Sequence, residues 1–270
     1  MSRVLTYLLI VFTAVFVTGC AEDGDKVSYM SESAFASLFP NYNVGKWVVE
    51  PGYEIARFTA NGTDAEAWFD HNGWIMTVWA MTPEKLPQHA QNSLASNYSQ
   101  WETVALRRLD RKVLATVYVV TVERNKVVYD LYFAENGMLV RKSDETNAKQ
   151  GAEKYLPAPK NDAVEKKMDE LYPDAVVYNC AVRSGAYAIC FVSSGNAKTA
   201  LFSTDGEWLL TSTPMSGQAI GKAVADAVEK QMPGSKISDL TLTETPSNSF
   251  YSIECRTGDG TTQMIYMDKK

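Results

Sequence analysis

The feature that most constrains the fold of this chain is a short turn motif that occurs three times. Each copy has an aromatic residue, a polar turn, a glycine and then the start of an apolar strand, and the copies are Phe69–Ile75, Phe133–Leu139 and Phe202–Leu209. Asn-Gly and Asp-Gly favour a tight hairpin turn, because glycine lacks a Cβ and Asn or Asp tolerates a positive φ. A short amphipathic helix and several strands precede each copy. The sequence therefore predicts tandem repeats of helix and β-hairpins.

Four such units can be read along the chain. Proline directly after an apolar or aromatic residue is expected to stop three of the helices, at Pro40, Pro173 and Pro233. The run from 113 to 122 is apolar at both odd and even positions, so we expect that strand to be covered on both faces. The expected helices lie near 35–39, with Ser31 as part of the cap, and near 83–98, 161–172 and 218–231. The expected strands are 44–50, 53–58, 65–69, 74–79, 101–108, 113–122, 127–133, 138–142, 176–182, 187–193, 198–202, 208–212, 237–243, 250–255 and 261–267.

A polar stretch followed by Pro157-Ala158-Pro159 interrupts the pattern after the second unit. This composition is typical of a linker. We therefore expect two domains, 31–146 and 161–270, joined by a linker at 147–160. The predicted fold class is α+β, with four units of a helix plus antiparallel strands grouped in two domains.

The N-terminus has the pattern of a targeting segment rather than of a folded element. Arg3 provides a positive charge, and 4–17 is an almost unbroken apolar run. Val17-Thr18-Gly19-Cys20 resembles a bacterial lipobox, in which the cysteine receives acyl chains such as palmitate. We predict a signal peptide at 1–19 and lipidation at Cys20; an ordinary secretory signal or an uncleaved anchor are the alternatives.

Residues 20–30 contain an acidic run and are expected to form a flexible tether between the lipid and the first domain. Removing residues 1–19 takes away one basic residue, Arg3, so the net charge changes from −6 to −7. A chain of this charge is not expected to bind nucleic acid, and its predicted link to a membrane is the lipid itself. The predicted location is the bacterial cell envelope, on the periplasmic or the exposed side of the outer membrane.

Three further cysteines follow Cys20. Cys180 and Cys190 flank a predicted hairpin turn, so they could lie opposite one another and form a disulfide in an oxidising compartment. The alternative is that they are small apolar core residues.

The repeat resembles a known family. A helix ending in aromatic-Pro, a Trp or Tyr strand and a Phe-Asp-x-x-Gly-x-Trp hairpin are similar to the PepSY-like family, whose fold is related to that of the β-lactamase inhibitory protein. The resemblance implies tandem repeats of short helices on a curved antiparallel sheet, and it implies no catalytic residues. The positions that carry it are Phe39-Pro40, Trp47, Tyr53, Phe69, Asp70, Gly73 and Trp74, followed by Tyr172-Pro173, Phe202, Asp205, Gly206 and Trp208.

Motifs for catalysis, metal binding or phosphate binding do not emerge from the sequence. His71 and His89 have no second histidine at ligand spacing, and Asp70-His71 beside Asn-Gly is ordinary turn chemistry. We therefore predict no cofactor, no metal site and no enzymatic activity.

Tryptophans are the remaining candidates for function. Most are expected to pack in the core, but Trp68 and Phe69 are adjacent on a strand and must point to opposite faces. One of them therefore faces away from the helix, toward either a binding face or a second packing layer. The candidate binding-face residues are Trp68, Trp74, Trp79 and Trp208.

These observations favour a non-catalytic, lipid-anchored module that binds or inhibits an envelope or extracellular protein through a sheet face. A structural or small-ligand-binding envelope lipoprotein is the alternative, and an enzyme is the third possibility. A cluster of aromatics on an open sheet would favour the first, a closed apolar cavity the second, and an acid–base pair in a cleft the third.

Overall fold

The computed structural model describes residues 26–148, 151–215 and 221–269. It contains two antiparallel sheets, of eight and seven strands, in which every strand pairs with its neighbour in sequence. All the predicted strands are present, so the α+β class and the two repeated domains are confirmed. The first sheet contains β1 (Val44–Glu50), β2 (Tyr53–Ala60), β3 (Thr63–Asp70), β4 (Gly73–Ala80), β5 (Glu102–Arg111), β6 (Leu114–Arg124), β7 (Val127–Phe133) and β8 (Leu139–Asp144). The second contains β9 (Val176–Arg183), β10 (Ala186–Ser193), β11 (Asn196–Ser203), β12 (Trp208–Pro214), β13 (Lys236–Glu244), β14 (Ser249–Arg256) and β15 (Thr262–Asp268).

One α-helix precedes each group of strands. The first begins earlier than expected because Ser28, rather than Ser31, is its N-cap and accepts a hydrogen bond from the Ser31 backbone. The second is split, since Pro87 separates a short 3₁₀ turn from the helix proper. The expected stops after Phe39, Tyr172 and Met232 are confirmed. The helices are α1 (Tyr29–Leu38), η1 (Pro83–Lys85), α2 (Gln88–Asn97), η2 (Glu153–Tyr155), α3 (Asp162–Leu171) and α4 (Lys222–Gln231).

The recurring turns use glycine as predicted, but the residue before the glycine behaves differently. Gly73, Gly137 and Gly206 have positive φ values of 97°, 78° and 88°, whereas no residue directly before them does. The strand after the turn then contains a bulge, two residues beyond Gly73 and three residues beyond Gly137 and Gly206. A Cβ on Gly137 would come within 2.4 Å of the His89 Cβ, so this turn also presses against α2.

Each helix shares a hydrophobic cluster with the strands that follow it. Phe35 of α1 lies with Phe58 and Phe69, while Leu86 and Ala90 lie with Phe133. Clusters of the same kind join α3 to β10 and β11, and α4 to β13, β14 and β15. The four helices therefore cover one face of each sheet, and the opposite face is available for other contacts.

The opposite face of the first sheet is largely covered by the rest of the chain. Trp68 points to this face and Phe69 to the α1 side, as predicted, but Trp68 is only 3% exposed. The cluster around it includes Tyr155 of η2, which lies within the predicted linker. A second packing layer therefore explains the alternating aromatics, and Trp68 belongs to the core.

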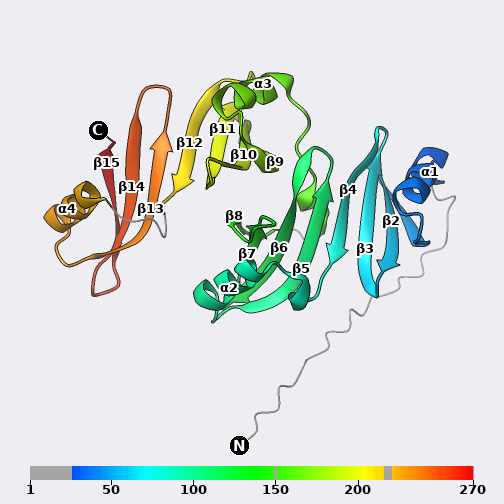
Figure 1. Ribbon diagram of the computed structural model, residues 1–270, viewed down its shortest axis with the longest axis horizontal. Coiled ribbons are helices and arrows are strands. Elements are labelled where there is room, and N and C mark those ends of the chain that lie inside the picture. The colour runs from blue at the N-terminus through cyan, green and yellow to red at the C-terminus, as the bar shows by residue number, and fades with distance from the viewer. Residues whose placement is uncertain (1–25, 149–150, 216–220, 270) are drawn as a thin grey trace, which may run out of the picture.

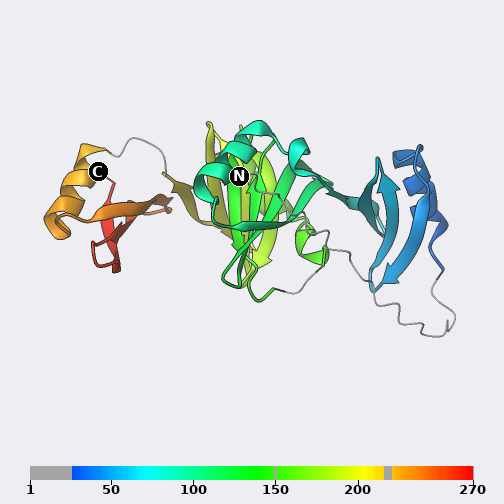
Figure 2. The ribbon, with the colours of Figure 1, turned by 90° about the horizontal axis from the view of Figure 1, so that it is seen from below.

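The two sheets meet near the middle of an elongated molecule, with α1 at one end and α4 at the other (Figure 1). The view from below shows the strands of the two sheets stacked at the centre (Figure 2). Tyr178 of β9, Val192 of β10 and Ala197 of β11 pack against the first sheet. Buried Arg111 donates a hydrogen bond to the Asn179 side chain at 3.0 Å and another to the Tyr178 carbonyl.

Strand β6 shows why this contact was partly foreseeable. Val117 and Val119 belong to the cluster on the side of the second sheet, whereas Val120 and Val122 belong to the cluster on the side of α2. The prediction that both faces of this strand are covered is therefore confirmed.

Candidate functional site

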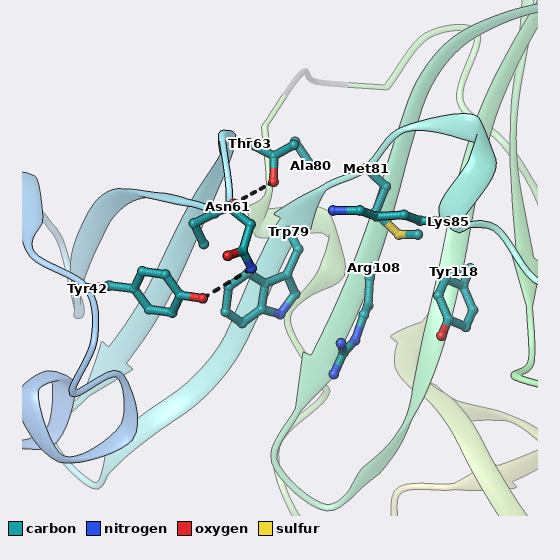
Figure 3. A pocket seen from close by; sticks show the side chains of 10 residues that line it. Tyr42, Asn61, Thr63, Trp79, Ala80, Met81, Lys85, Arg108 and Tyr118 are labelled. Carbon is teal, nitrogen blue, oxygen red and sulfur yellow. Dashed lines mark hydrogen bonds between the residues drawn. The ribbon is translucent and has the colours of Figure 1, made fainter.

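An open groove lies on the helix-bearing face of the first sheet, where the first and second units meet. Its volume is about 320 Å³. Figure 3 shows Trp79 and Arg108 on its floor, with Tyr42 on one side and Tyr118 on the other. The lining residues are Tyr42, Ala60, Asn61, Thr63, Trp79, Ala80, Met81, Lys85, Arg108 and Tyr118.

The floor of the groove is a row of directly paired residues on adjacent strands. Trp79 of β4 pairs with Arg108 of β5, which pairs with Tyr118 of β6. Paired residues in antiparallel strands point to the same face of a sheet. Trp79 packs against the cluster under α1 and Tyr118 against the cluster under α2. Arg108 therefore lies between the two hydrophobic clusters, and the gap between these clusters is the groove.

Asp110 lies two residues after Arg108 on β5 and fixes the orientation of the Trp79 and Arg108 side chains. Its carboxylate accepts hydrogen bonds from the Trp79 indole at 2.7 Å, from Arg108 Nε at 3.1 Å and from the Thr116 hydroxyl at 2.8 Å. Arg108 also forms an ion pair with Asp110 at 2.9 Å. A guanidinium has five N–H donors, so this fork leaves donors that point away from Asp110. The Arg108 side chain is 47% exposed, and a ligand can reach those donors.

Three side chains besides Arg108 make the groove suited to a ligand with both acidic and apolar groups. Lys85, from η1, adds a second cation at the rim and is exposed. Burial raises the pKa of the Tyr118 hydroxyl above its ordinary value near 10, so this group is a neutral donor at physiological pH. The Trp79 ring provides apolar area on the other side of Arg108. Arg and aromatic side chains of this kind are the usual anchors of protein interfaces.

Trp79 is the predicted tryptophan that lines the groove. Trp74 and Trp208, by contrast, are half-buried at equivalent places in two repeats. Each donates its indole N–H to a threonine three residues later, Thr77 or Thr211, at 2.9 Å in both cases. This repeated bond ties the start of the strand after the turn to its middle, which is a structural role.

The disulfide between Cys180 and Cys190 is not formed, and all three described cysteines are free thiols. Cys180 pairs with Ile189, and Cys190 pairs with Asn179. The two cysteines are therefore one position apart in register, and their side chains point to opposite faces of the sheet. Burial raises the pKa of Cys180 to about 11, so it behaves as a core residue.

The remaining predictions concern lipidation, the two histidines and metal binding. Cys20 lies outside the described residues, so lipidation stays a prediction. His71 and His89 are both exposed and lie on different elements. Within the described ranges no group of three His, Cys, Asp or Glu side chains is placed to hold a metal ion, and no helix is long and apolar enough to cross a bilayer.

Sequence reasoning missed Arg108, Asp110 and Tyr118. Arg108 and Tyr118 lie on predicted strands and Asp110 lies between two of them, but the pairing of β4 with β5 brings all three to Trp79 across a helical connection. An aligned comparison of the two domains would have flagged Arg108, because the second domain has Leu242 in its place.

A family model matches residues 52–141 and 185–270, which is well over half of the chain. The family is described as "Putative beta-lactamase-inhibitor-like, PepSY-like". The chain belongs to this PepSY-like family. The two matched regions contain most of the two sheets, so the PepSY-like repeat is present once in each domain, and the expected relation to β-lactamase-inhibitor-like proteins is confirmed.

Matches among solved structures include proteins from Bacteroides species. A BLIP-like protein of Bacteroides fragilis is 32% identical, with a TM-score of 0.44, and the match covers 47% of this chain and 92% of that one. A DUF2874 family protein of Bacteroides ovatus is 22% identical, with a TM-score of 0.45, over 49% of this chain and 99% of that one. A second DUF2874 family protein, from Bacteroides uniformis, is 21% identical, with a TM-score of 0.43, over 46% and 94%. No curated protein matches the chain.

Proposed function

We propose that this PepSY-like protein is a non-catalytic binding module of the bacterial envelope, and that the groove at Trp79 and Arg108 contacts its partner. The observation that supports the proposal is that the rest of the chain covers the face of the first sheet opposite the helices. Because η2 and the second sheet cover the face of the first sheet opposite the helices, that face is not accessible where Trp68 lies. The groove is the accessible place where a predicted tryptophan meets fixed polar groups.

The chemistry of the groove defines the partner. Arg108 and Lys85 favour a carboxylate, and the Trp79 and Tyr42 rings favour an apolar side chain beside it. The groove is open rather than enclosed, so it suits an exposed segment of a protein better than a small molecule buried on all sides. The proposed partner is therefore a protein that presents an acidic residue next to an aromatic or aliphatic one.

Location at the envelope rests on the N-terminal sequence. A lipid on Cys20 would keep the domains at a membrane surface at the end of the acidic tether 20–30. Cys20→Ser in the full chain is expected to abolish acyl labelling and to move the protein from the membrane fraction to the soluble fraction. Unchanged fractionation without an acyl label in the native chain would contradict the lipoprotein part of the proposal.

Site-specific photo-crosslinking in cells tests the groove. A photoreactive residue replaces Lys85 in the full chain, and a matched control carries it at Lys222, an exposed lysine of α4. We expect a discrete protein adduct at position 85 and none of the same mass at position 222. Arg108→Gln should reduce the adduct by about tenfold, because a charge-assisted hydrogen bond is lost.

Three outcomes would contradict the groove as the contact site. They are the absence of any adduct at position 85, an equal adduct at position 222, and an adduct that is insensitive to Arg108→Gln. Trp208→Phe is the control substitution of a tryptophan outside the groove. It should leave the adduct at position 85 unchanged, because the Trp208 indole is bonded within the fold and lies away from the groove.

A further inference from the structure

The fourth unit presents an open sheet edge at β15. In the first three units the third strand pairs on its outer side with a fourth strand, so that β3 pairs with β4, β7 with β8 and β11 with β12. β15 corresponds to these third strands, and it is the last strand of its sheet. Among the described residues, none occupies the place of a fourth strand beside it.

The face of β15 opposite α4 carries exposed apolar side chains. Counted back from the strand ends at Asp70 and Asp268, Tyr266 corresponds to Trp68. Trp68 pairs with Met76 of the fourth strand and is also covered by η2 and the second sheet, and it is 3% exposed, whereas Tyr266 is 66% exposed. Met264, two residues earlier, is 48% exposed. An aromatic at a position that is core elsewhere in the repeat is thus left in solvent.

The backbone of β15 is free to pair in the same way. The Lys269 N–H donates to the Ser249 carbonyl, which makes the odd-numbered residues the ones bonded to β14. In an antiparallel ladder the alternate residues then turn their N–H and C=O groups outward, and these include Met264 and Tyr266. The strand has no bulge in its pairing with β14 and no charged residue from Thr262 to Met267. Natural sheet edges usually carry such protection, and β1 has both a bulge and Lys46.

The position of α4 decides what kind of occupant fits. α1 contacts both β3 and β4, so in the first unit the helix extends over the fourth strand. α4 contacts β15 in the corresponding way, and Val224 and Val228 share a cluster with Ile265. A second copy paired edge to edge would bring a second α4 to the same face beside the first. A single extended strand without a helix of its own avoids that crowding.

We propose that the outer edge of β15 receives one extended segment of another polypeptide, which pairs antiparallel and completes the fourth unit. The three fourth strands of this chain define the chemistry of that segment. Opposite Tyr266 it carries an apolar residue or an arginine, as Met76, Leu210 and Arg141 lie opposite Trp68, Leu201 and Tyr132. It also carries an aromatic or aliphatic residue opposite Met267, facing α4, as Trp208 lies opposite Phe202. This site is separate from the groove at Trp79.

The test uses the full chain and a fluorescent peptide that copies residues 206–213, the start of the fourth strand of the third unit. We expect saturable binding by fluorescence anisotropy, and no binding of the same peptide with Leu210→Pro, which lacks the N–H that faces Tyr266. In the protein, Tyr266→Ser should weaken binding by about fivefold. Met264→Pro should weaken it by about tenfold, because it removes an outward donor and leaves the β14 ladder intact.

Controls separate the edge from other surfaces. Val49→Ser changes an exposed apolar residue of the β1 edge, and Arg108→Gln changes the groove, and neither should alter peptide binding. Hydrogen exchange should show peptide-dependent protection in 262–268. The proposal is overturned if the native peptide does not bind saturably, if Tyr266→Ser and Met264→Pro leave its affinity unchanged, or if protection appears outside the second domain.

Discussion

The two domains repeat the same junction between units, but they fill it differently. In the first domain the Met81 N–H donates to the Leu106 carbonyl at 3.0 Å, and in the second the Met215 N–H donates to the Leu240 carbonyl at 2.7 Å. These matching bonds align Trp79 with Thr213. They also align Arg108 with Leu242. Trp79 and Arg108 are directly paired on β4 and β5, and Thr213 and Leu242 are directly paired on β12 and β13.

This difference separates what the fold requires from what it does not. Leu242 is 8% exposed and simply continues the core, and Thr213 is buried with no partner for its hydroxyl. The second domain thus builds the junction without an aromatic side chain or a cation at these two positions. A junction of this kind therefore does not require a Trp–Arg pair, which supports a binding role for Trp79 and Arg108.

The largest effect is expected where the domains agree. Gly137→Ala and Gly206→Ala should each destabilise the protein by about 3 kcal/mol, because the new methyl would overlap His89 and Ala90 or Ala163 and would sit at positive φ. Gly73→Ala has open space around it and should lose about 1 kcal/mol from backbone strain alone. Urea unfolding of the three variants measures this. Equal losses at all three glycines would contradict the helix contact.

Exchanging the differing residues should separate binding from stability. Trp79→Thr with Arg108→Leu gives the first domain the residues of the second, and it should abolish the adduct at position 85. The loss in stability should be about 2 kcal/mol, because Trp79 packs edge-on against Phe39 and Phe58. Adduct yield and urea unfolding are measured on the same samples. A folded double variant with a full adduct would refute the role of the pair.

The tryptophans after the turns should behave alike in both domains. Trp74→Phe and Trp208→Phe each remove one indole hydrogen bond to a threonine and should each destabilise the protein by about 1 kcal/mol. Neither should change the adduct at position 85. A loss of the adduct in Trp74→Phe without unfolding would extend the binding site to the turn.

The smallest expected effect is a difference between the two domains in how their stability depends on acidic pH. Asp174 accepts hydrogen bonds from the Ser193 hydroxyl and the Ser194 backbone, and these bonds hold its pKa below the ordinary value. The residue after the corresponding proline in the first domain is Asn41, which does not titrate. A lowered carboxyl pKa adds stability that is present above the unfolded pKa, near 4, and is lost as the pH falls through the folded one. Asp174→Asn should flatten the acid limb of the stability profile, as followed by thermal unfolding between pH 2 and 6.

Local pattern was enough to predict most of the fold. The bounds 44–50 and 127–133 match β1 and β7, because alternation and turn residues mark both ends of these strands. Long-range contacts were not predictable in the same way. Whether Trp68 faces solvent depends on where β9 to β11 lie, and no local pattern encodes that. The cysteine register was missed because the turn pairs Arg183 directly with Ala186, which places Ile189 rather than Cys190 opposite Cys180. The groove needs β4 and β5 side by side, although a helix separates them in sequence.

Indole signals in a nitrogen-labelled NMR spectrum test the binding role of the groove most directly. The chain has six tryptophans, and Trp→Phe variants assign the signals of Trp74, Trp79 and Trp208. The protein crosslinked at position 85, once identified, is titrated into the full chain. We predict that the Trp79 signal shifts, because its N–H bonds to Asp110 beside Arg108, while the Trp74 and Trp208 signals stay in place. An unmoved Trp79 signal at saturation would contradict the assignment of binding to this groove.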